Sequence, residues 1–269
     1  MTPRSLLAAV LAVLCLVAAG ACGSSPTSPP APNPSPNPNP NPNPNPEPQP
    51  QPPTFAVTKI MAFGDSLTEG DPPEPGVIRL RPAHDPSTPG GQKSYPYKLS
   101  TILKTTYTSQ ATELRVFNLG KGGERAESSE TRARLVNALA TYQPEVLLLM
   151  HGTNDLLSGA SQNAAVDAIE ELIELAQRHP GVQRVYLASL PPQLPSTTHT
   201  TVPDEVPVFN QRLRDRAAAT GVEFVDIFPN IDTQTMMQPD GVHINEAGNQ
   251  RIAEVFYAAL KPRYHRDPQ

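Results

Sequence analysis

One stretch of the sequence indicates the fold class most clearly: Val146-Leu147-Leu148-Leu149-Met150-His151-Gly152-Thr153-Asn154-Asp155. Its first five residues are apolar without a break, which is typical of a β-strand that is buried on both faces. The apolar run then changes into a polar turn that contains a histidine, an asparagine and an aspartate. Because strands buried on both faces occur mostly in parallel sheets, this stretch predicts a sheet covered by helices on either side.

Apolar strand-like runs alternate with segments of helical period on both sides of this stretch. The predicted strands are residues 57–63, 114–118, 146–151, 185–188 and 223–227. The predicted helices are residues 95–104, 131–142, 164–178, 206–220 and 245–260. Such alternation predicts parallel strands joined by right-handed crossovers. We therefore expect an α/β/α sandwich with a five-stranded parallel sheet, whose chemistry lies at the carboxyl ends of the strands.

Composition divides the chain of 269 residues into three segments, because 16 of its 34 prolines lie within residues 1–53. Residues 1–21 contain an apolar run that is shorter than the about 20 residues that span a bilayer, and small residues follow it. They predict a secretory signal peptide. Residues 22–54 are rich in Pro and Asn, which predicts an extended polyproline II linker. Residues 55–269 predict one globular domain.

Both cysteines, Cys15 and Cys22, precede this domain. Ala19-Gly20-Ala21-Cys22 fits an ordinary signal-peptidase site and also resembles a bacterial lipoprotein motif, in which the cysteine becomes lipidated. The Gly-, Ser- and Pro-rich tether that follows favours the second interpretation. We expect an exported protein that is anchored to the bacterial cell envelope through Cys22, with a freely secreted protein as the alternative.

The charge and residue types of the domain exclude several classes of function. It carries 20 Lys and Arg against 25 Asp and Glu and has no basic run, so nucleic acid is not an expected partner. It lacks cysteine, which excludes disulfides, zinc–thiolate sites and a cysteine nucleophile. It also lacks the spaced histidines and carboxylates of common metal motifs. We predict neither a metal nor an organic cofactor.

Four polar blocks occur at predicted strand ends and before the last helix. They are Gly64-Asp65-Ser66, Asn118-Leu119-Gly120-Lys121-Gly122-Gly123, Gly152-Thr153-Asn154-Asp155 and Asp240-Gly241-Val242-His243. The order Ser, Gly, Asn, His resembles the SGNH (GDSL) hydrolase superfamily, and the resemblance spans residues 58–260. It implies the flavodoxin-like fold of that superfamily and hydrolysis of carboxylic esters without a cofactor.

The chemistry of ester cleavage accounts for these residue types. A serine hydroxyl needs a base to become a nucleophile, and Ser66 and His243 are the candidates. Asp240 lies three residues before His243, so its carboxylate can reach and orient the imidazole. The resemblance assigns the stabilisation of the oxyanion to the Ser66 N–H, the Gly123 N–H and the Asn154 side chain.

Some of these assignments have alternatives. Gly120 and Gly122 compete with Gly123, although the family spacing counted from Asn118 selects Gly123. Asp240 could instead be a turn residue that leaves the orientation of the histidine to a backbone carbonyl.

Three neighbouring residues are expected to be structural. Asp65 is predicted to order its loop, Asp155 to cap a helix, and His151 to be a packed or hydrogen-bonded histidine.

The two long connections 71–94 and 189–206 are predicted to border the substrate cleft, with a passive surface loop as the alternative for the first. Neither is rich in aromatic residues or contains a long apolar stretch, so we expect a shallow, open site. The predicted function is a serine esterase that acts on short or medium acyl esters or on O-acetyl groups, with a small molecule, a lipid or an acetylated polysaccharide as the substrate. An acyltransferase with the same site and a non-catalytic tethered binding protein are the alternatives.

Overall fold

The protein is described by a computed structural model over residues 51–70, 93–195 and 202–268. All of these described residues lie in one compact unit, residues 49–269. Within it, five strands form one parallel sheet in the order β3-β2-β4-β5-β6. These strands are β2 (Lys59–Gly64), β3 (Arg115–Gly120), β4 (Val146–Met150), β5 (Arg184–Ala188) and β6 (Glu223–Val225). The predicted five-stranded parallel sheet is confirmed.

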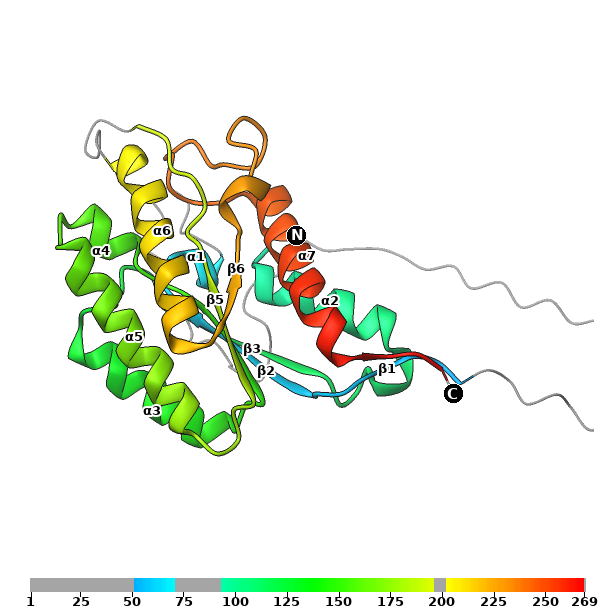
Figure 1. Cartoon of the computed structure of the whole chain (residues 1–269). Coiled ribbons are helices and arrows are strands. Elements are labelled where there is room, and N and C mark those ends of the chain that lie inside the picture. Colours follow the sequence, from blue (N-terminus) through cyan, green and yellow to red (C-terminus); the bar gives the residue numbers. More distant parts are fainter. Residues whose placement is uncertain (1–50, 71–92, 196–201, 269) are drawn as a thin grey trace, which may run out of the picture. The chain divides into compact units, whose positions relative to one another are not determined.

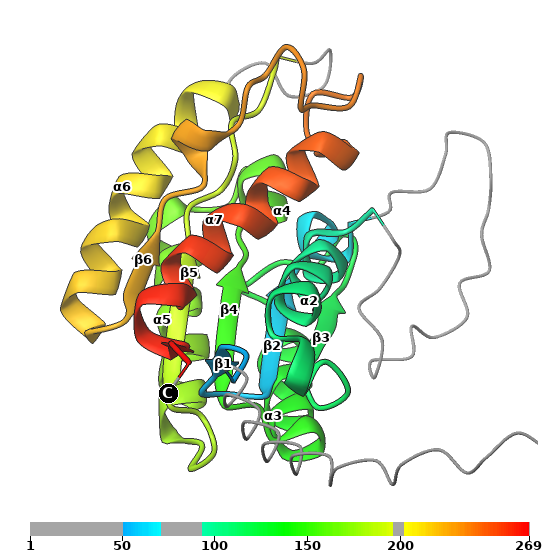
Figure 2. The same ribbon diagram turned by 90° about the vertical axis from the view of Figure 1, so that its right-hand side faces the viewer.

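Helices cover both faces of the sheet (Figures 1 and 2). On one face lie α2 (Tyr95–Thr106) and α7 (Glu246–Tyr264). On the other face lie α3 (Ser129–Tyr142), α5 (Gln162–Arg178) and α6 (Val202–Thr220). The predicted α/β/α sandwich is therefore confirmed. The shorter elements are α1 (Ser66–Glu69), α4 (Thr153–Leu157) and the 3-10 turns η1 (Thr108–Gln110) and η2 (Phe228–Asn230).

The core lies on both sides of β4, whose five residues are all fully buried. From α5, Ile169 and Leu172 pack into it, and from α7, Ile252 and Phe256 do the same on the opposite face. Burial of one such side chain contributes about 1.5–3 kcal/mol to folding. The continuous apolar run of β4 is thus explained by its place in the middle of the sheet.

Helices α6 and α7 both extend further than the sequence predicts. Helix α6 begins at Val202 rather than at residue 206, because Pro203 falls in the first turn, where its missing N–H needs no partner. Helix α7 continues through Pro262 to Tyr264 rather than ending at Leu260. Pro262 lies in the last turn, where it removes one hydrogen bond, while Leu260 and Tyr264 remain buried.

A small antiparallel sheet that the sequence does not predict joins the two ends of the domain. It pairs β1 (Thr54–Phe55) with β7 (His265–Arg266). Phe55 packs against Tyr107 and Tyr264, with ring centroids 4.9 and 5.6 Å apart. The first strand thus starts at Thr54, so the predicted linker, residues 22–54, is one residue too long at its end. Strands of two residues have no periodicity that a sequence pattern could reveal.

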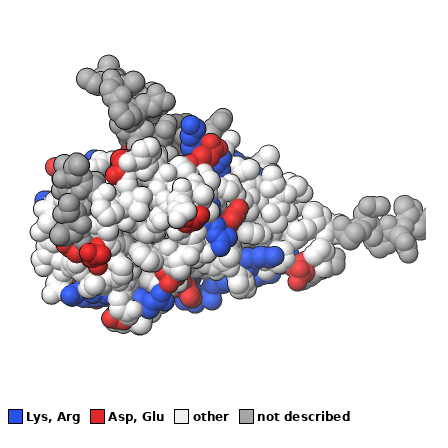
Figure 3. Space-filling view, turned by 90° about the horizontal axis from the view of Figure 1, so that it is seen from above, with Lys and Arg blue, Asp and Glu red and all other residues white. Residues whose placement is uncertain are grey.

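The sheet order fixes where a site can form. Strand β2 pairs with both β3 and β4, so the chain changes direction across the sheet at β2. In open α/β sheets, ligands bind at such a switch point, beyond the carboxyl ends of the strands. Figure 3 looks down on the upper end of the molecule in Figure 1, towards which β6 runs. In this view acidic and basic side chains are interspersed rather than gathered by sign.

Candidate active site

Ser66 lies directly beyond the carboxyl end of β2, where the chain turns into the short helix α1. Asp65 forms this turn, because its Oδ1 accepts a hydrogen bond of 2.9 Å from the Leu67 N–H. Asp65 is fully buried, and this burial raises the pKa of its carboxyl above the usual value. The hydrogen bond to Leu67 agrees with the prediction that Asp65 orders this loop. The Ser66 side chain is half-buried.

The turn before α7 places Asp240 and His243 beside Ser66. The Asp240 carboxylate accepts hydrogen bonds of 2.9 Å from the N–H groups of Val242 and His243. Its second oxygen lies 2.6 Å from Nδ1 of His243. On the other edge of the ring, Nε2 of His243 lies 2.9 Å from Oγ of Ser66. The structure therefore joins the hydroxyl, the imidazole and the carboxylate in one chain of hydrogen bonds.

The same contacts set the charge of Asp240. Partial burial by itself would raise the pKa of Asp240, but hydrogen bonds from the His243 ring and from the His243 and Val242 N–H groups lower it below the usual value. The carboxylate therefore stays ionised at neutral pH. An ionised carboxylate at this position favours the proton on Nδ1 of His243 and leaves Nε2 free to accept the serine proton.

The glycine-rich loop after β3 distinguishes the three candidate glycines. The Gly120 N–H donates to Oδ1 of Asn118 at 2.9 Å, and the Gly122 N–H donates to the Glu69 carboxylate at 2.9 Å. Among the residues that the structure describes, the N–H of Gly123 has no hydrogen-bond partner. Gly123 also has a φ of +75°, a left-handed conformation that favours glycine. Its N–H is thus the one of the three that remains available to a ligand.

Asn154 is the second residue of α4, the helix that follows the strand on the other side of β2. Its Nδ2 donates a hydrogen bond of 3.0 Å to the main-chain oxygen of Glu124, which leaves its second N–H for another acceptor. This bond links the loops that follow β3 and β4, across the end of β2 from which Ser66 extends. The N–H of Ser66 likewise has no partner within the described ranges.

A buried charged cluster behind the glycine-rich loop was not predicted. Glu124 has a side chain only 3% exposed, and it receives a two-pronged hydrogen bond from Arg134 of α3. Burial by itself would raise the pKa of Glu124, but hydrogen bonds from His151 and Arg134 hold it at about 2. A glutamate next to Gly123 is visible in the sequence, but its arginine partner lies ten residues further on and gives no local signal.

His151 and Asp155 complete the connection between the two loops. His151 is fully buried, which agrees with its predicted structural role, and its Nε2 lies 3.4 Å from the Glu124 carboxylate. Asp155 does not cap α4 as predicted. Its carboxylate instead accepts hydrogen bonds from the N–H groups of Ala126 (2.8 Å) and Glu127 (3.2 Å), because the loop after β3 passes close to it.

One of the two predicted cleft-bordering connections is partly described. The N–H of Leu194 donates to the Gly241 oxygen at 2.7 Å, which places residues 189–195 against the Asp240 turn. Residues 202–206 of the same predicted connection form the start of α6, and residues 196–201 and 71–92 lie outside the described residues.

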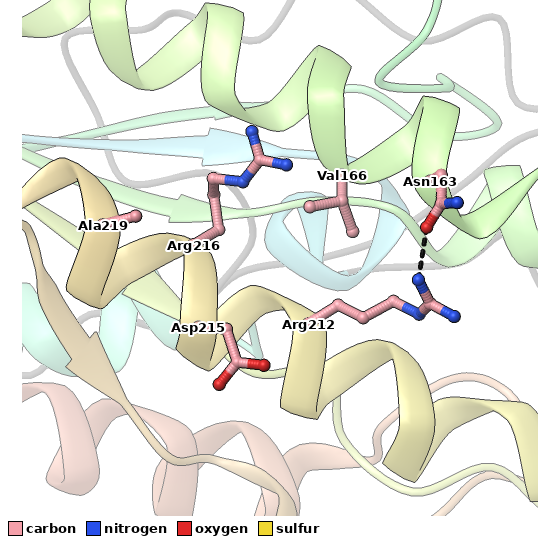
Figure 4. A pocket seen from close by; sticks show the side chains of 6 residues that line it. All are labelled: Asn163, Val166, Arg212, Asp215, Arg216 and Ala219. Carbon is pink, nitrogen blue, oxygen red and sulfur yellow. Dashed lines mark hydrogen bonds between the residues drawn. The ribbon is translucent and has the colours of Figure 1, made fainter.

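A surface groove of about 380 Å³ lies between α5 and α6, and none of the predicted site residues lines it (Figure 4). Its two arginines are engaged by their neighbours: Arg212 donates to Asn163, and Arg216 pairs with Asp167 and Glu170.

The described ranges show neither a metal site nor a membrane span. Residues 51–70, 93–195 and 202–268 contain no group of three His, Cys, Asp or Glu side chains that is placed to hold a metal ion. No helix within the same ranges has the length and apolar character needed to cross a bilayer.

Fold and site together define a class of protein. The fold is a parallel α/β sandwich, and beyond its strand ends a serine, a histidine and an aspartate are joined by successive hydrogen bonds. This combination is typical of a hydrolase. Comparison with protein families identifies which one. The GDSL-like lipase/acylhydrolase family matches residues 62–251, and the chain belongs to this family. The protein is therefore a carboxylic ester hydrolase.

Solved structures with the same fold include three that are described as enzymes. LAE5, an alpha/beta hydrolase enzyme from the metagenome of Lake Arreo in Spain, is 24% identical with a TM-score of 0.60, over 77% of this chain and 96% of LAE5. Axe2, an acetylxylan esterase from Geobacillus stearothermophilus, is 18% identical with a TM-score of 0.60, over 77% of this chain and 96% of Axe2. Est24, a carbohydrate acetylesterase from Sinorhizobium meliloti, is 18% identical with a TM-score of 0.58, over 76% of this chain and 99% of Est24. No curated protein matches the sequence.

Proposed function

We propose that the protein cleaves esters through an acyl-enzyme formed on Ser66. The Ser66 oxygen attacks the ester carbonyl while Nε2 of His243 takes the hydroxyl proton. The tetrahedral intermediate then collapses, the C–O bond to the alcohol breaks, and the departing alkoxide receives that proton from His243. Water, deprotonated by His243, attacks the acyl group, and Ser66 leaves with its proton restored. Asp240 orients the ring and stabilises the imidazolium that forms in each half of the reaction.

The observation that carries this proposal is the position of His243 between its two partners. Its two ring nitrogens lie 2.9 Å from the Ser66 oxygen and 2.6 Å from the Asp240 carboxylate. Both distances are within hydrogen-bond reach, which is the geometric requirement for a general base and the group that orients it.

The oxyanion that forms on the former carbonyl oxygen needs donors that are not already engaged. We propose the N–H groups of Ser66 and Gly123 and the second amide N–H of Asn154. This assignment is supported by the N–H groups of Ser66 and Gly123, which have no hydrogen-bond partner within the part of the chain that the structure describes. So does the order of the strands, since all three residues follow neighbouring strands of the sheet. Each donor of this kind contributes about 10²–10³-fold to the rate.

The proposed substrates are esters of short or medium carboxylic acids, including O-acetyl groups. Two of the similar solved structures are described as an acetylxylan esterase and a carbohydrate acetylesterase, which supports acetyl as the acyl group. The chain contains no tryptophan with which to stack a sugar ring. The proposal therefore specifies the acyl group of the ester and not its alcohol.

The test is hydrolysis of p-nitrophenyl acetate by the purified protein and by Ser66→Ala, with the fold of both matched by circular dichroism. We expect the variant to lose at least about four orders of magnitude in kcat/KM, as expected for loss of a serine nucleophile. Equal activity of the two proteins would exclude Ser66 as the nucleophile. Product analysis with a sugar acceptor would reveal acyl transfer in place of hydrolysis.

We also propose that the protein is exported and anchored to the cell envelope through a lipid on Cys22, which lies outside the described residues. The short apolar run and the small residues before Cys22 support this proposal. Wild type is expected to partition into the detergent phase and Cys22→Ala into the aqueous phase. Partitioning of both proteins into the aqueous phase would exclude the anchor.

A further inference from the structure

Glu124 connects the two loops that supply the proposed oxyanion donors. It directly follows Gly123, and both its main chain and its side chain contact the turn that carries Asn154. We propose that Glu124, held by Arg134 and His151, is a positioning residue that fixes the donors of Gly123 and Asn154 for oxyanion stabilisation. This inference rests on the proposed function and assigns to it a residue outside the triad and the oxyanion donors.

The main-chain contact determines the orientation of the Asn154 amide. The oxygen of Glu124 is only an acceptor, so the amide must turn its NH₂ group towards it, as the 3.0 Å bond shows. The reversed amide would place two oxygens against each other and would present an acceptor where a donor is needed. With the amide held in this way, its second N–H remains for the substrate.

The side-chain contact holds the same turn at a second point. Nδ1 of His151 accepts a hydrogen bond of 3.1 Å from the Gly152 N–H, so the proton of the neutral ring is on Nε2. That nitrogen lies 3.4 Å from the Glu124 carboxylate. Glu124 therefore contacts the turn at His151 and again at Asn154, three residues later, and this fixes the turn against rotation.

Arg134 ties the cluster to the sheet and balances its charge. Besides its two-pronged contact with Glu124, its guanidinium donates to the main-chain oxygens of Leu119 (2.6 Å) and Gly64 (3.3 Å). It also lies over the ring of Phe63, 3.8 Å from the centroid. A bare carboxylate next to an oxyanion would oppose it, and the cation removes that repulsion. Through Arg134, the loops that carry the proposed donors are attached to the ends of β2 and β3.

The experiment compares Glu124→Gln with Glu113→Gln, a matched control at an exposed glutamate just before β3. Arg134→Lys, which keeps the charge and loses the two-pronged contact, is the milder second variant. All are assayed on p-nitrophenyl acetate. For Glu124→Gln we expect kcat to fall about 10–100-fold with KM within about threefold, because displaced donors cost rate rather than substrate binding. We expect Arg134→Lys to show the same pattern more weakly and the control to be unchanged.

A double-mutant cycle separates positioning from a general effect on the fold. If Glu124 acts through the donors, Glu124→Gln is expected to lower kcat by a clearly smaller factor in an Asn154→Ala background than in the wild type, because only the Gly123 donor is then left to displace. Multiplicative losses in the double variant, or a rise in KM with kcat unchanged, would overturn the inference. Should Glu124→Gln melt below the assay temperature, Arg134→Lys takes its place in the cycle with the same criteria.

The controls also separate this inference from the proposed function. Ser66→Ala and Asn154→Ala are measured in the same series. If both are impaired while Glu124→Gln and Arg134→Lys match the control, positioning by Glu124 is excluded and the proposed function stands. If Asn154→Ala retains full kcat, the oxyanion assignment fails and this inference fails with it.

Discussion

The two halves of the candidate site are held in different ways. The acid–base half consists of Asp240 and His243, which lie in one turn and have side chains 47% and 23% exposed. The half that we propose to stabilise the oxyanion, called the oxyanion half, consists of Gly123 and Asn154 with the loops that carry them. Behind it lies the side chain of Glu124, only 3% exposed, within a cluster that joins three neighbouring strands.

This difference follows from where the functional groups come from. An aspartate and a histidine three residues apart can be set by hydrogen bonds within their own turn, here from the Val242 and His243 N–H groups. The proposed oxyanion donors come from separate loops, which no local hydrogen bond can hold together. Buried contacts between distant residues hold them instead. The acid–base half should therefore tolerate mutation without loss of fold, whereas changes in the oxyanion half should affect rate and stability together.

The largest effect is expected in the acid–base half. His243→Ala should lower kcat/KM by about 10⁴–10⁶-fold, because the serine loses its base. Since the side chain is in an exposed turn, the free energy of unfolding should change by less than about 1 kcal/mol. Steady-state kinetics and urea unfolding of the same preparation measure both quantities. A large loss of stability would contradict the contrast between the two halves.

Removal of one donor from the oxyanion half should have a smaller effect on rate. Asn154→Ala is expected to lower kcat by about 10²–10³-fold with KM nearly unchanged, because the donor acts on the transition state. It should also destabilise the fold by about 1 kcal/mol, since its bond to the Glu124 oxygen is lost. A rise in KM alone would assign Asn154 to substrate binding instead.

Acid should weaken the oxyanion half through Glu124. The folded protein lowers the pKa of Glu124 from 4.5 to about 2, so this carboxylate stabilises the fold above about pH 4.5, and the contribution is lost as the pH falls towards 2. At about 1.4 kcal/mol per pH unit, the loss is roughly 3 kcal/mol. Urea unfolding between pH 5 and pH 2.5 should show a steeper decline in wild type than in Glu124→Gln. Parallel declines would show that Glu124 does not titrate in this way.

The smallest effect is expected at two glycines that share one conformation. Gly123 and Gly221 have φ of +75° and +70°, and a Cβ at either would meet nothing within 4 Å. Alanine at each should cost about 1–2 kcal/mol through backbone strain alone. Only Gly123→Ala should also lower kcat, because alanine keeps the N–H but places a Cβ where the substrate oxygen is proposed to approach it. Equal kcat in the two variants would contradict a close approach of the substrate to residue 123.

The sequence predicted the sheet well because its signals are local. The apolar run of β4 and the alternation of strands with helices define the parallel sandwich without any knowledge of contacts. Element ends were less predictable, as α7 shows, since Pro262 is tolerated in the last turn when the flanking residues are buried. The pairing of β1 with β7 depends on a contact between the two ends of the domain, which no local pattern encodes.

In the candidate site, too, the residues with a local sequence signal were predictable and those defined by tertiary contacts were not. Ser66, Asp240 and His243 could be chosen from residue type and spacing, and the structure places them in hydrogen-bond contact. Glu124 and Arg134 could not, because their significance depends on burial and on partners from different elements. Asp155 shows the same limit, since its carboxylate serves the loop after β3 rather than its own helix.

The proposed role of Ser66 as the nucleophile can be tested directly by covalent labelling, which identifies the residue that an active-site reagent modifies. An organophosphate ester such as diethyl p-nitrophenyl phosphate is expected to phosphorylate the activated serine and release p-nitrophenol. Peptide mass spectrometry of the inactivated protein should then find one diethyl phosphate per chain, on Ser66, and none on His243→Ala treated in the same way. An adduct on another residue, or inactivation that leaves Ser66 unmodified, would contradict the proposed mechanism.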